Sequence, residues 1–190
     1  MLSDNAKVAD SIGAAVSKTG SVDGRVNFGG VFHFKCYDKD GNLKWEDSTH
    51  NLVVNEGLKD LNDKYFSGSG YSATWYLGLV NASPSPSYAA GDTLATHAGW
   101  VETTDYSGNR KAVTFGAASL ADPSVISNTA VPSQFLMTGT VTVAGAFLCS
   151  AATGTSGVLF SVSSFQAPGN RAMVSGDTLV VTYQFSADAA

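Results

Sequence analysis

The sequence predicts a mainly β protein: an antiparallel β-sandwich or jelly roll with one internal α-helix and an N-terminal arm. Three observations lead to this fold class. Short apolar segments, often of alternating polarity, recur along the chain between turns rich in Gly and Ser. Helical spacing is convincing within the body of the chain only near residues 55–66. Residues 1–25 differ from the rest, so we divide the 190 residues into an arm at 1–25 and a sandwich domain at 26–190.

Residues 3–19 of the arm have the pattern of a weak amphipathic helix, which Gly20 would end. Three β-branched side chains form a stripe along one face: Val8, Ile12 and Val16. This stripe is too narrow to form a core by itself, and such short helices are marginal in water. We therefore predict a docking arm that orders on another surface, with the stripe as candidate interface. A mobile terminus is the alternative.

Residues 26–37 predict a strong strand, followed by a hairpin turn at 38–42 and a return strand that begins at Leu43. Three side chains of the first strand share one face: Phe32, Phe34 and Cys36. Gly41 can adopt the positive φ that a short hairpin loop requires.

Within residues 52–66 the spacing of apolar residues changes from that of a strand to that of a helix. Residues 52–54 complete a strand, Asn55 can cap the helix, and Glu56 suits the positive end of the helix dipole. The face expected to point inward consists of Leu58, Leu61, Tyr65 and Phe66. A Gly-Ser-Gly sequence at 68–70 then stops the helix.

The remainder of the chain is predicted to be β. Residues 73–80 are apolar on both faces, which indicates a central or covered strand. A long connection at 81–93 follows, and connections of this length are usually functional or lie against a neighbour. Further strands are expected at 110–115, 135–143, 145–149, 158–162 and 178–185.

The composition is poor in charge, with 14% charged residues and a net charge of −5, where about a quarter charged is usual. Residues 67–190 hold only 3 of the 11 Lys and Arg and 6 of the 16 Asp and Glu. Such a surface opposes close subunit contact weakly, so we expect a homo-oligomer; a neutral surface without self-association is the alternative. No basic cluster is present to neutralise phosphates, so we expect no direct nucleic-acid binding.

Cys36 and Cys149 lie in apolar strand patterns, so we expect buried free thiols. The sequence shows no signal-peptide pattern and no apolar run that could span a membrane, which favours synthesis in a reducing cytoplasm and no membrane association. The histidines His33, His50 and His97 are isolated in the sequence. We therefore expect neither a metal site nor a cofactor.

Catalytic motifs are missing from the sequence. There is no nucleophile elbow and no glycine-rich phosphate loop. One polar cluster has residue types suited to acid–base chemistry: Asp92, His97, Glu102 and Asp105. Because no nucleophile or oxyanion site accompanies it, we predict a hydrogen-bonded loop and no enzymatic activity.

Aromatic residues surround the long connection: Tyr71, Trp75, Tyr76, Trp100 and Tyr106. If exposed, they could stack on sugar rings or anchor a protein interface. We expect Trp75 and Tyr76 to belong to the core. For Trp100 and Tyr106 both interpretations stay open, and they join the stripe of the arm as candidate interface residues.

Several segments together carry a family resemblance: GVF at 30–32, CYDKDGNLKW at 36–45, NLVVNEGL at 51–58, WYLGL at 75–79, GDT at 91–93, HAGWVE at 97–102 and VSGDTL at 174–179, continuing to Tyr183. This combination resembles a family of small virion structural proteins of tailed bacteriophages. The resemblance implies a capsid-associated or tail-associated component present in many copies. It transfers no catalytic or ligand-binding residue.

On this resemblance we expect a capsid decoration or cement protein, which binds the outer head and reinforces contacts between capsid subunits. Its expected partners are the major capsid protein and further copies of itself in a homo-oligomer, with a trimer as one candidate. The expected location is the virion, after synthesis in the host bacterial cytoplasm. The alternative is a tail-fibre or adaptor module that recognises a host cell-surface glycan through Trp100 and Tyr106.

Overall fold

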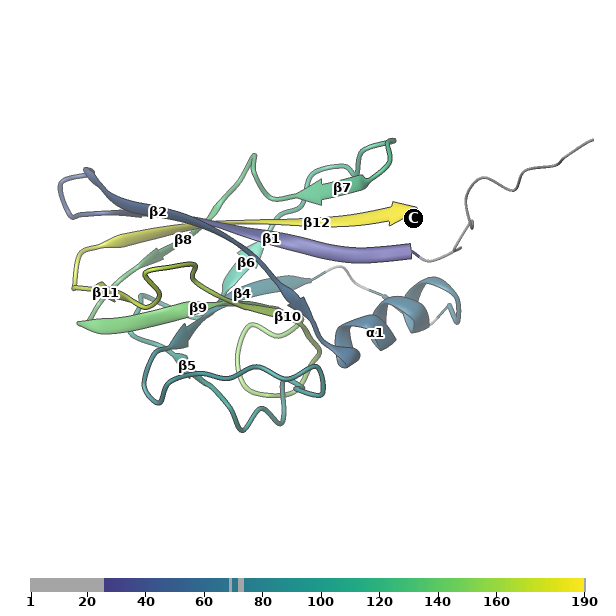
Figure 1. Ribbon diagram of the computed structural model, residues 1–190, viewed down its shortest axis with the longest axis horizontal. Coiled ribbons are helices and arrows are strands. Elements are labelled where there is room, and N and C mark those ends of the chain that lie inside the picture. Colours follow the sequence, from purple (N-terminus) through teal and green to yellow (C-terminus); the bar gives the residue numbers. More distant parts are fainter. Residues whose placement is uncertain (1–25, 69, 72–73, 190) are drawn as a thin grey trace, which may run out of the picture.

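A computed structural model describes residues 26–68, 70–71 and 74–189 of the chain (Figure 1). Within these residues two antiparallel sheets pack as a sandwich, and one helix, α1 (Asn55–Tyr65), lies at one end. The predicted mainly β fold with an internal helix is confirmed. The predicted arm, with Val8, Ile12 and Val16, lies outside the described residues.

The first sheet is built around the long pair β1 and β12. Five strands of the described chain form it: β1 (Val26–Tyr37), β2 (Leu43–His50), β7 (Ser124–Ser127), β8 (Ser133–Leu136) and β12 (Thr178–Ala189). β1 pairs with β12 along its whole length and with β2 on its other side. β8 and β7 pair with the first and last parts of β12, respectively.

The second sheet has β9 and β4 at its centre. Seven strands of the described chain form it: β3 (Leu52–Val53), β4 (Trp75–Asn81), β5 (Val101–Thr103), β6 (Lys111–Val113), β9 (Val141–Cys149), β10 (Leu159–Ser164) and β11 (Arg171–Met173). The order is β3-β10-β9-β4-β5, with β11 on β9 and β6 on β4. β4 therefore takes the central place that its apolar pattern predicts.

The main core fills the space between the sheets. Phe32, Phe34 and Cys36 of β1 are buried there, as their alternation predicts, against Leu148 and other side chains of the second sheet. A second cluster covers the outer face of the second sheet, where Trp100 and the loop at 82–100 pack on it. The second sheet is thus buried on both faces, which explains why β4 and β9 lack alternating polarity.

Helix α1 is attached to the sandwich through its first turn, in a way the sequence did not predict. Val54, not Asn55, occupies the cap position, and no side chain caps the helix. The Glu56 carboxylate instead accepts hydrogen bonds from the backbone N–H groups of Leu94 (3.0 Å) and Leu159 (2.7 Å). At Gly57 a Cβ atom would lie 2.5 Å from the Phe160 carbonyl oxygen, so the helix backbone packs directly on β10.

The strand predicted at 135–143 is wrong as a single element. β8 ends at Leu136 and β9 begins at Val141, because the chain crosses there from the first sheet to the second. The Met137 N–H donates to the Asp177 carbonyl (2.8 Å), which fixes the crossing. Thr138, Gly139 and Thr140 form the crossing, and with neither Pro nor a charged residue among them the pattern does not reveal it. Among the described residues, no helix has the length and apolar character needed to cross a membrane.

Candidate functional site

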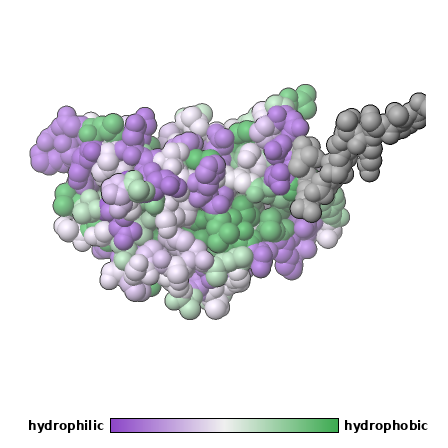
Figure 2. Space-filling model, viewed as in Figure 1, coloured by the Kyte–Doolittle hydropathy of each residue, from purple (hydrophilic) through white to green (hydrophobic). Residues whose placement is uncertain are grey.

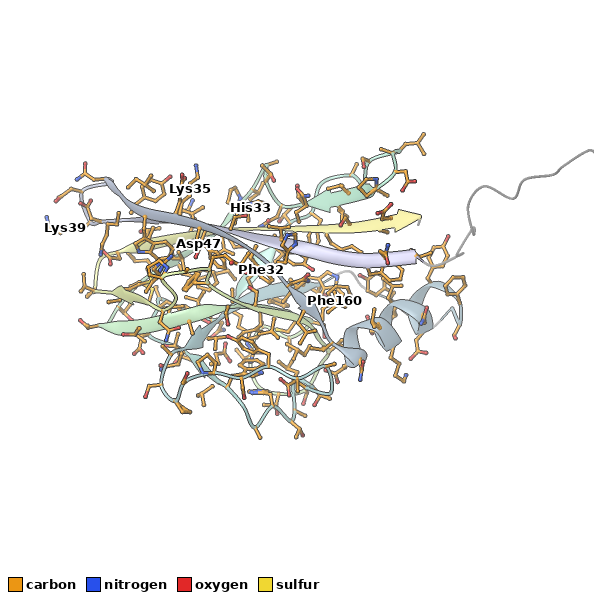
Figure 3. The ribbon with its side chains drawn as sticks, in the orientation of Figure 1. Phe32, His33, Lys35, Lys39, Asp47 and Phe160 are labelled. Carbon is orange, nitrogen blue, oxygen red and sulfur yellow. The ribbon has the colours of Figure 1, made fainter. Side chains whose placement is uncertain are left out.

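A groove opens between the two sheets at the end of the sandwich beside α1. We call it the aromatic groove. It encloses about 350 Å³ and is lined by Leu61, Tyr71, Trp75, Phe115, Ile126, Leu148, Phe160, Tyr183 and Phe185. Figure 3 labels Phe160 between β1 and α1, and Figure 2 shows hydrophobic surface in this region of the same view. Its volume lies within the range of known ligand pockets.

The groove continues the main core toward α1, where the described residues cover it less completely. Toward the β1–β2 turn, Leu179 and Val181 of β12 are fully buried between the sheets, whereas Phe185 at the other end is only partly buried. β1 follows the same trend, since Val26 and Phe28 are exposed. The inward face of the first sheet thus becomes more exposed toward this end.

Aromatic rings form a continuous row along the groove. The Phe160 ring lies 5.4 Å from the rings of both Trp75 and Phe185, with edge-on geometry. The Phe185 ring in turn stacks on Phe28 at 6.0 Å. The Tyr183 hydroxyl accepts a hydrogen bond from Asn51 Nδ2 (2.9 Å). Burial raises the pKa of Tyr183. The groove therefore presents ring faces and edges.

One end of the groove is polar. Tyr71 and Trp75 also line an adjoining hollow of about 220 Å³, together with Asp60, Lys64, Thr74, Ser150 and Val158. Trp75 Nε1 donates a hydrogen bond to the Tyr71 hydroxyl (2.9 Å), and Lys64 Nζ lies 5.8 Å from the centre of the Tyr71 ring. The pair Tyr71–Trp75 therefore separates an apolar compartment from a polar one.

Large apolar side chains surround the mouth of the groove. We call this set the apolar rim: Val26, Phe28, Tyr65, Phe66 and Tyr71. Tyr65, Phe66 and Tyr71 are 81%, 77% and 55% exposed. The prediction that Tyr65 and Phe66 face the core is therefore wrong, because α1 rests on β10 through its first turn and its last turn projects beyond the sandwich.

Trp100 and Tyr106 are buried, with 2% and 4% of their surface exposed. Trp100 lies between His97, stacked at 3.8 Å, and Phe147, and its Nε1 donates to Asp92 (3.0 Å). Tyr106 packs edge-on against Phe135, and burial is the main cause of its raised pKa. The candidate interface role of Trp100 and Tyr106 is corrected: both side chains belong to the core of their own chain.

The polar cluster near the long connection does not converge on one point. Asp92 holds Trp100 and the Ala89 N–H (3.1 Å). Glu102 forms a bidentate pair with Arg110 at 2.7 and 2.9 Å. Asp105 accepts from the Thr103 hydroxyl (2.8 Å). Each carboxylate thus has a local hydrogen-bonding partner in the loops, as the sequence suggested.

Both cysteines are free and buried, as predicted. Burial raises the pKa of the Cys36 thiol to about 11, with the nearby Asp177 carboxylate adding to the effect, and burial also raises the pKa of Cys149. His33 is exposed and hydrogen-bonds to the Ser48 hydroxyl (2.8 Å). In the part of the chain that the structure describes, no group of three or more His, Cys, Asp and Glu side chains could hold a metal ion.

Sequence reasoning found two residues of the groove but missed its other walls. Tyr71 and Trp75 were among the aromatic residues singled out, and the structure joins them by a hydrogen bond. Phe160 is itself buried in the main core, and Phe185 continues the alternation of the buried residues of β12, so no local signal marks either as a wall of the groove. Comparison with protein-family models, curated proteins and solved structures found no match to this chain. Its function is therefore inferred from its sequence and structure alone.

Proposed function

We propose that this chain is a structural protein of a bacteriophage virion that binds the outer head and reinforces contacts between capsid subunits. The observation that supports the proposal is the apolar rim around the aromatic groove, where Tyr65 and Phe66 are almost fully exposed. Large exposed apolar patches on a folded chain usually mark interaction sites. Tyr, Trp and Phe are also the side chains most enriched at the centres of protein interfaces.

In this mechanism the rim docks on the capsid surface and buries its rings there. A decoration protein acts in many copies, so each contact can be modest while the summed effect over the shell is large. A copy that spans the joint between two capsid subunits opposes their separation. The charge-poor part of the chain after residue 66 would let neighbouring copies pack side by side with little repulsion.

Binding to capsids tests the proposal directly. Particles that lack the native protein are incubated with the wild-type chain or with the double variant Tyr65→Ser, Phe66→Ser, and occupancy is measured on purified particles. We expect apparent affinity to fall at least about tenfold, because truncating an aromatic anchor commonly costs roughly 2 kcal/mol.

The matched control is Leu43→Ser, which removes an exposed apolar side chain at the β1–β2 turn, away from the groove. This variant should keep wild-type occupancy. Equal occupancy of the double variant and the wild type, or a wild-type chain that does not bind particles at all, would reject the proposal.

Glycan recognition is a second candidate, favoured by one observation. The pair Tyr71–Trp75 borders a hollow with the polar side chains Asp60, Lys64 and Ser150, and aromatic rings beside polar groups are suited to sugar rings. Titration with purified host surface polysaccharide would then show binding that Tyr71→Ala abolishes and Tyr65→Ala preserves. If the wild-type chain does not bind the polysaccharide, glycan recognition is rejected and only the structural role remains as a candidate.

A further inference from the structure

We infer that the aromatic groove is the docking site of the chain's own N-terminal segment, residues 3–19, bound as a helix with Val8, Ile12 and Val16 against the groove. This inference goes beyond the proposed function and is independent of it. It rests on the groove and on where the chain enters β1, whereas capsid binding rests on the exposed rim.

The first argument is that, within residues 26–68, 70–71 and 74–189, nothing covers the groove on one side. Its walls come from α1 and from the inner faces of both sheets, and Phe160, Leu148 and Tyr183 belong to the main core. Apolar surface that is removed from water stabilises the folded chain in proportion to its area. An apolar segment in the groove would complete the core at this end.

The second argument is proximity. β1 begins with Val26 at the end of the sandwich where α1 lies (Figure 1), and the Phe28 ring stacks on Phe185, a wall of the groove. Residues 17–25 connect Val16 to this point in the sequence, and they include Gly20 and Gly24. A flexible tether of this length spans roughly 17 Å on average. The groove is therefore within reach of the segment that precedes it.

The third argument is complementarity of shape and polarity. On a helix, positions 8, 12 and 16 fall on one face and extend over about 12 Å, which fits beside the roughly 16 Å of α1. Small residues, Ala9 and Ala15, flank this stripe, and the opposite face carries polar residues. Amphipathic helices bind grooves with anchors at this spacing.

The fourth argument identifies the source of the segment. A segment tied to its own groove by a short flexible tether has an effective concentration in the millimolar range. A second copy in solution at micromolar concentration offers the same contacts at a far lower concentration. Docking within one chain is therefore favoured over exchange between chains.

Disulfide trapping in the full-length protein tests this arrangement. Ile12→Cys is combined with Ile126→Cys, which places a thiol on the groove wall, and the native Cys36 and Cys149 stay buried. Mild oxidation should give a cross-linked monomer, identified by peptide mapping under non-reducing conditions. The control pair Ile12→Cys and Leu43→Cys, with one thiol at the opposite end, should not cross-link.

Melting temperatures test the same arrangement in variants that carry no introduced cysteine. Ile12→Asp should lower the melting temperature by roughly 4–8 °C, whereas Lys7→Ala on the opposite helical face should leave it unchanged. Cross-links between copies would overturn docking within one chain, and equal melting temperatures of Ile12→Asp and wild type would overturn docking altogether. Neither result bears on capsid binding, because no particle is present.

Discussion

The core between the two sheets is covered differently at the two ends of the sandwich. Toward the β1–β2 turn, charged side chains cover the aromatic rings. We call this the closed end: Lys44, Trp45, Asp47, Phe165, Arg171 and Asp177. Toward α1, the apolar rim is exposed, and Trp75, Phe115 and Phe185 of the aromatic groove are only partly buried. Figure 3 labels Lys39 and Asp47 toward the closed end and Phe160 toward α1, and Figure 2 shows a hydrophobic area in the middle of this view with hydrophilic surface at the end beside the β1–β2 turn.

The closed end shows how such rings can be sealed. The Arg171 guanidinium lies 5.5 Å from the centre of the Trp45 ring and 5.7 Å from that of Phe165, and it pairs with the buried Asp47 carboxylate at 3.2 Å. Lys44 pairs with the buried Asp177 at 2.5 Å. The fold therefore can cover an aromatic end with paired charges. At the α1 end of the described chain, by contrast, Tyr65, Phe66 and Tyr71 stay exposed, although Lys64 lies beside the Tyr71 ring.

The largest expected effect tests the cover of the closed end. Arg171→Ala removes the cation over two rings and leaves the buried Asp47 carboxylate with no opposite charge, only the backbone N–H groups of Ser48 and Gln166. We expect the free energy of unfolding to fall by about 3 kcal/mol, measured by urea denaturation, because breaking a buried ion pair strands a charge. Lys39→Ala, which breaks the exposed pair with Asp40, should change it by less than about 0.5 kcal/mol. Similar losses in both variants would show that the closed end is not sealed by Arg171.

A somewhat smaller effect is expected where α1 joins the sandwich. Glu56→Ala removes the acceptor of two backbone N–H groups, of Leu94 and Leu159. Since each unpaired amide is costly, unfolding should become easier by roughly 2 kcal/mol. The helix should also loosen and widen the groove, which a rise in binding of an apolar fluorescent dye would report. Lys59→Ala on the exposed face of α1 is the control and should alter neither quantity.

The smallest expected effect is a loss of stability at high pH, and it also arises at the closed end of the sandwich. Burial holds the pKa of the Cys36 thiol at about 11 in the folded chain, against about 8.5 when unfolded. The folded state therefore keeps a proton that the unfolded state releases, so this contribution is complete below about pH 8.5 and is lost as pH rises toward about 11. The hydrogen bond from Lys44 to Asp177 raises the pKa of Lys44, and its contribution is likewise lost as pH rises.

Urea midpoints measured between pH 8 and pH 10.5 check this expectation. Stability should decline over the range in the wild-type chain and decline less in Cys36→Ala. An identical slope in both proteins would contradict a role for the thiol. The aromatic groove has no comparable thiol among its walls, so the docking of a segment there should respond little to pH in this range.

Much of the fold could be predicted from local patterns. Alternating polarity predicted β1 and β12, the turn at Gly41 predicted the first hairpin, and the change from strand to helix spacing predicted α1. These features depend on neighbouring residues, which a sequence displays directly. The buried thiols followed from the apolar strand patterns in which Cys36 and Cys149 lie.

The candidate site could be predicted only in part, because it depends on how distant elements diverge. Whether Phe185 is covered depends on the spacing between the sheets at one end, and its strand pattern is the same in either case. Tyr65 is exposed because α1 is fixed at Gly57, just over two turns earlier. Trp100 belongs to a second cluster that forms only when the long connection folds over β9. Tyr71 and Trp75 were noticed because aromatic residues near a loop stand out by composition.

The position of β12 has a consequence for how the chain is made. β12 follows every strand it pairs with, and its partners on β1 lie more than 140 residues earlier. At usual rates of synthesis, β1 and β2 would wait on the ribosome for roughly ten seconds or longer before β12 emerges. During that time the apolar face and free edge of β1 can pair with other nascent chains. A protein needed in many copies would then depend on chaperones during translation more than its modest size suggests.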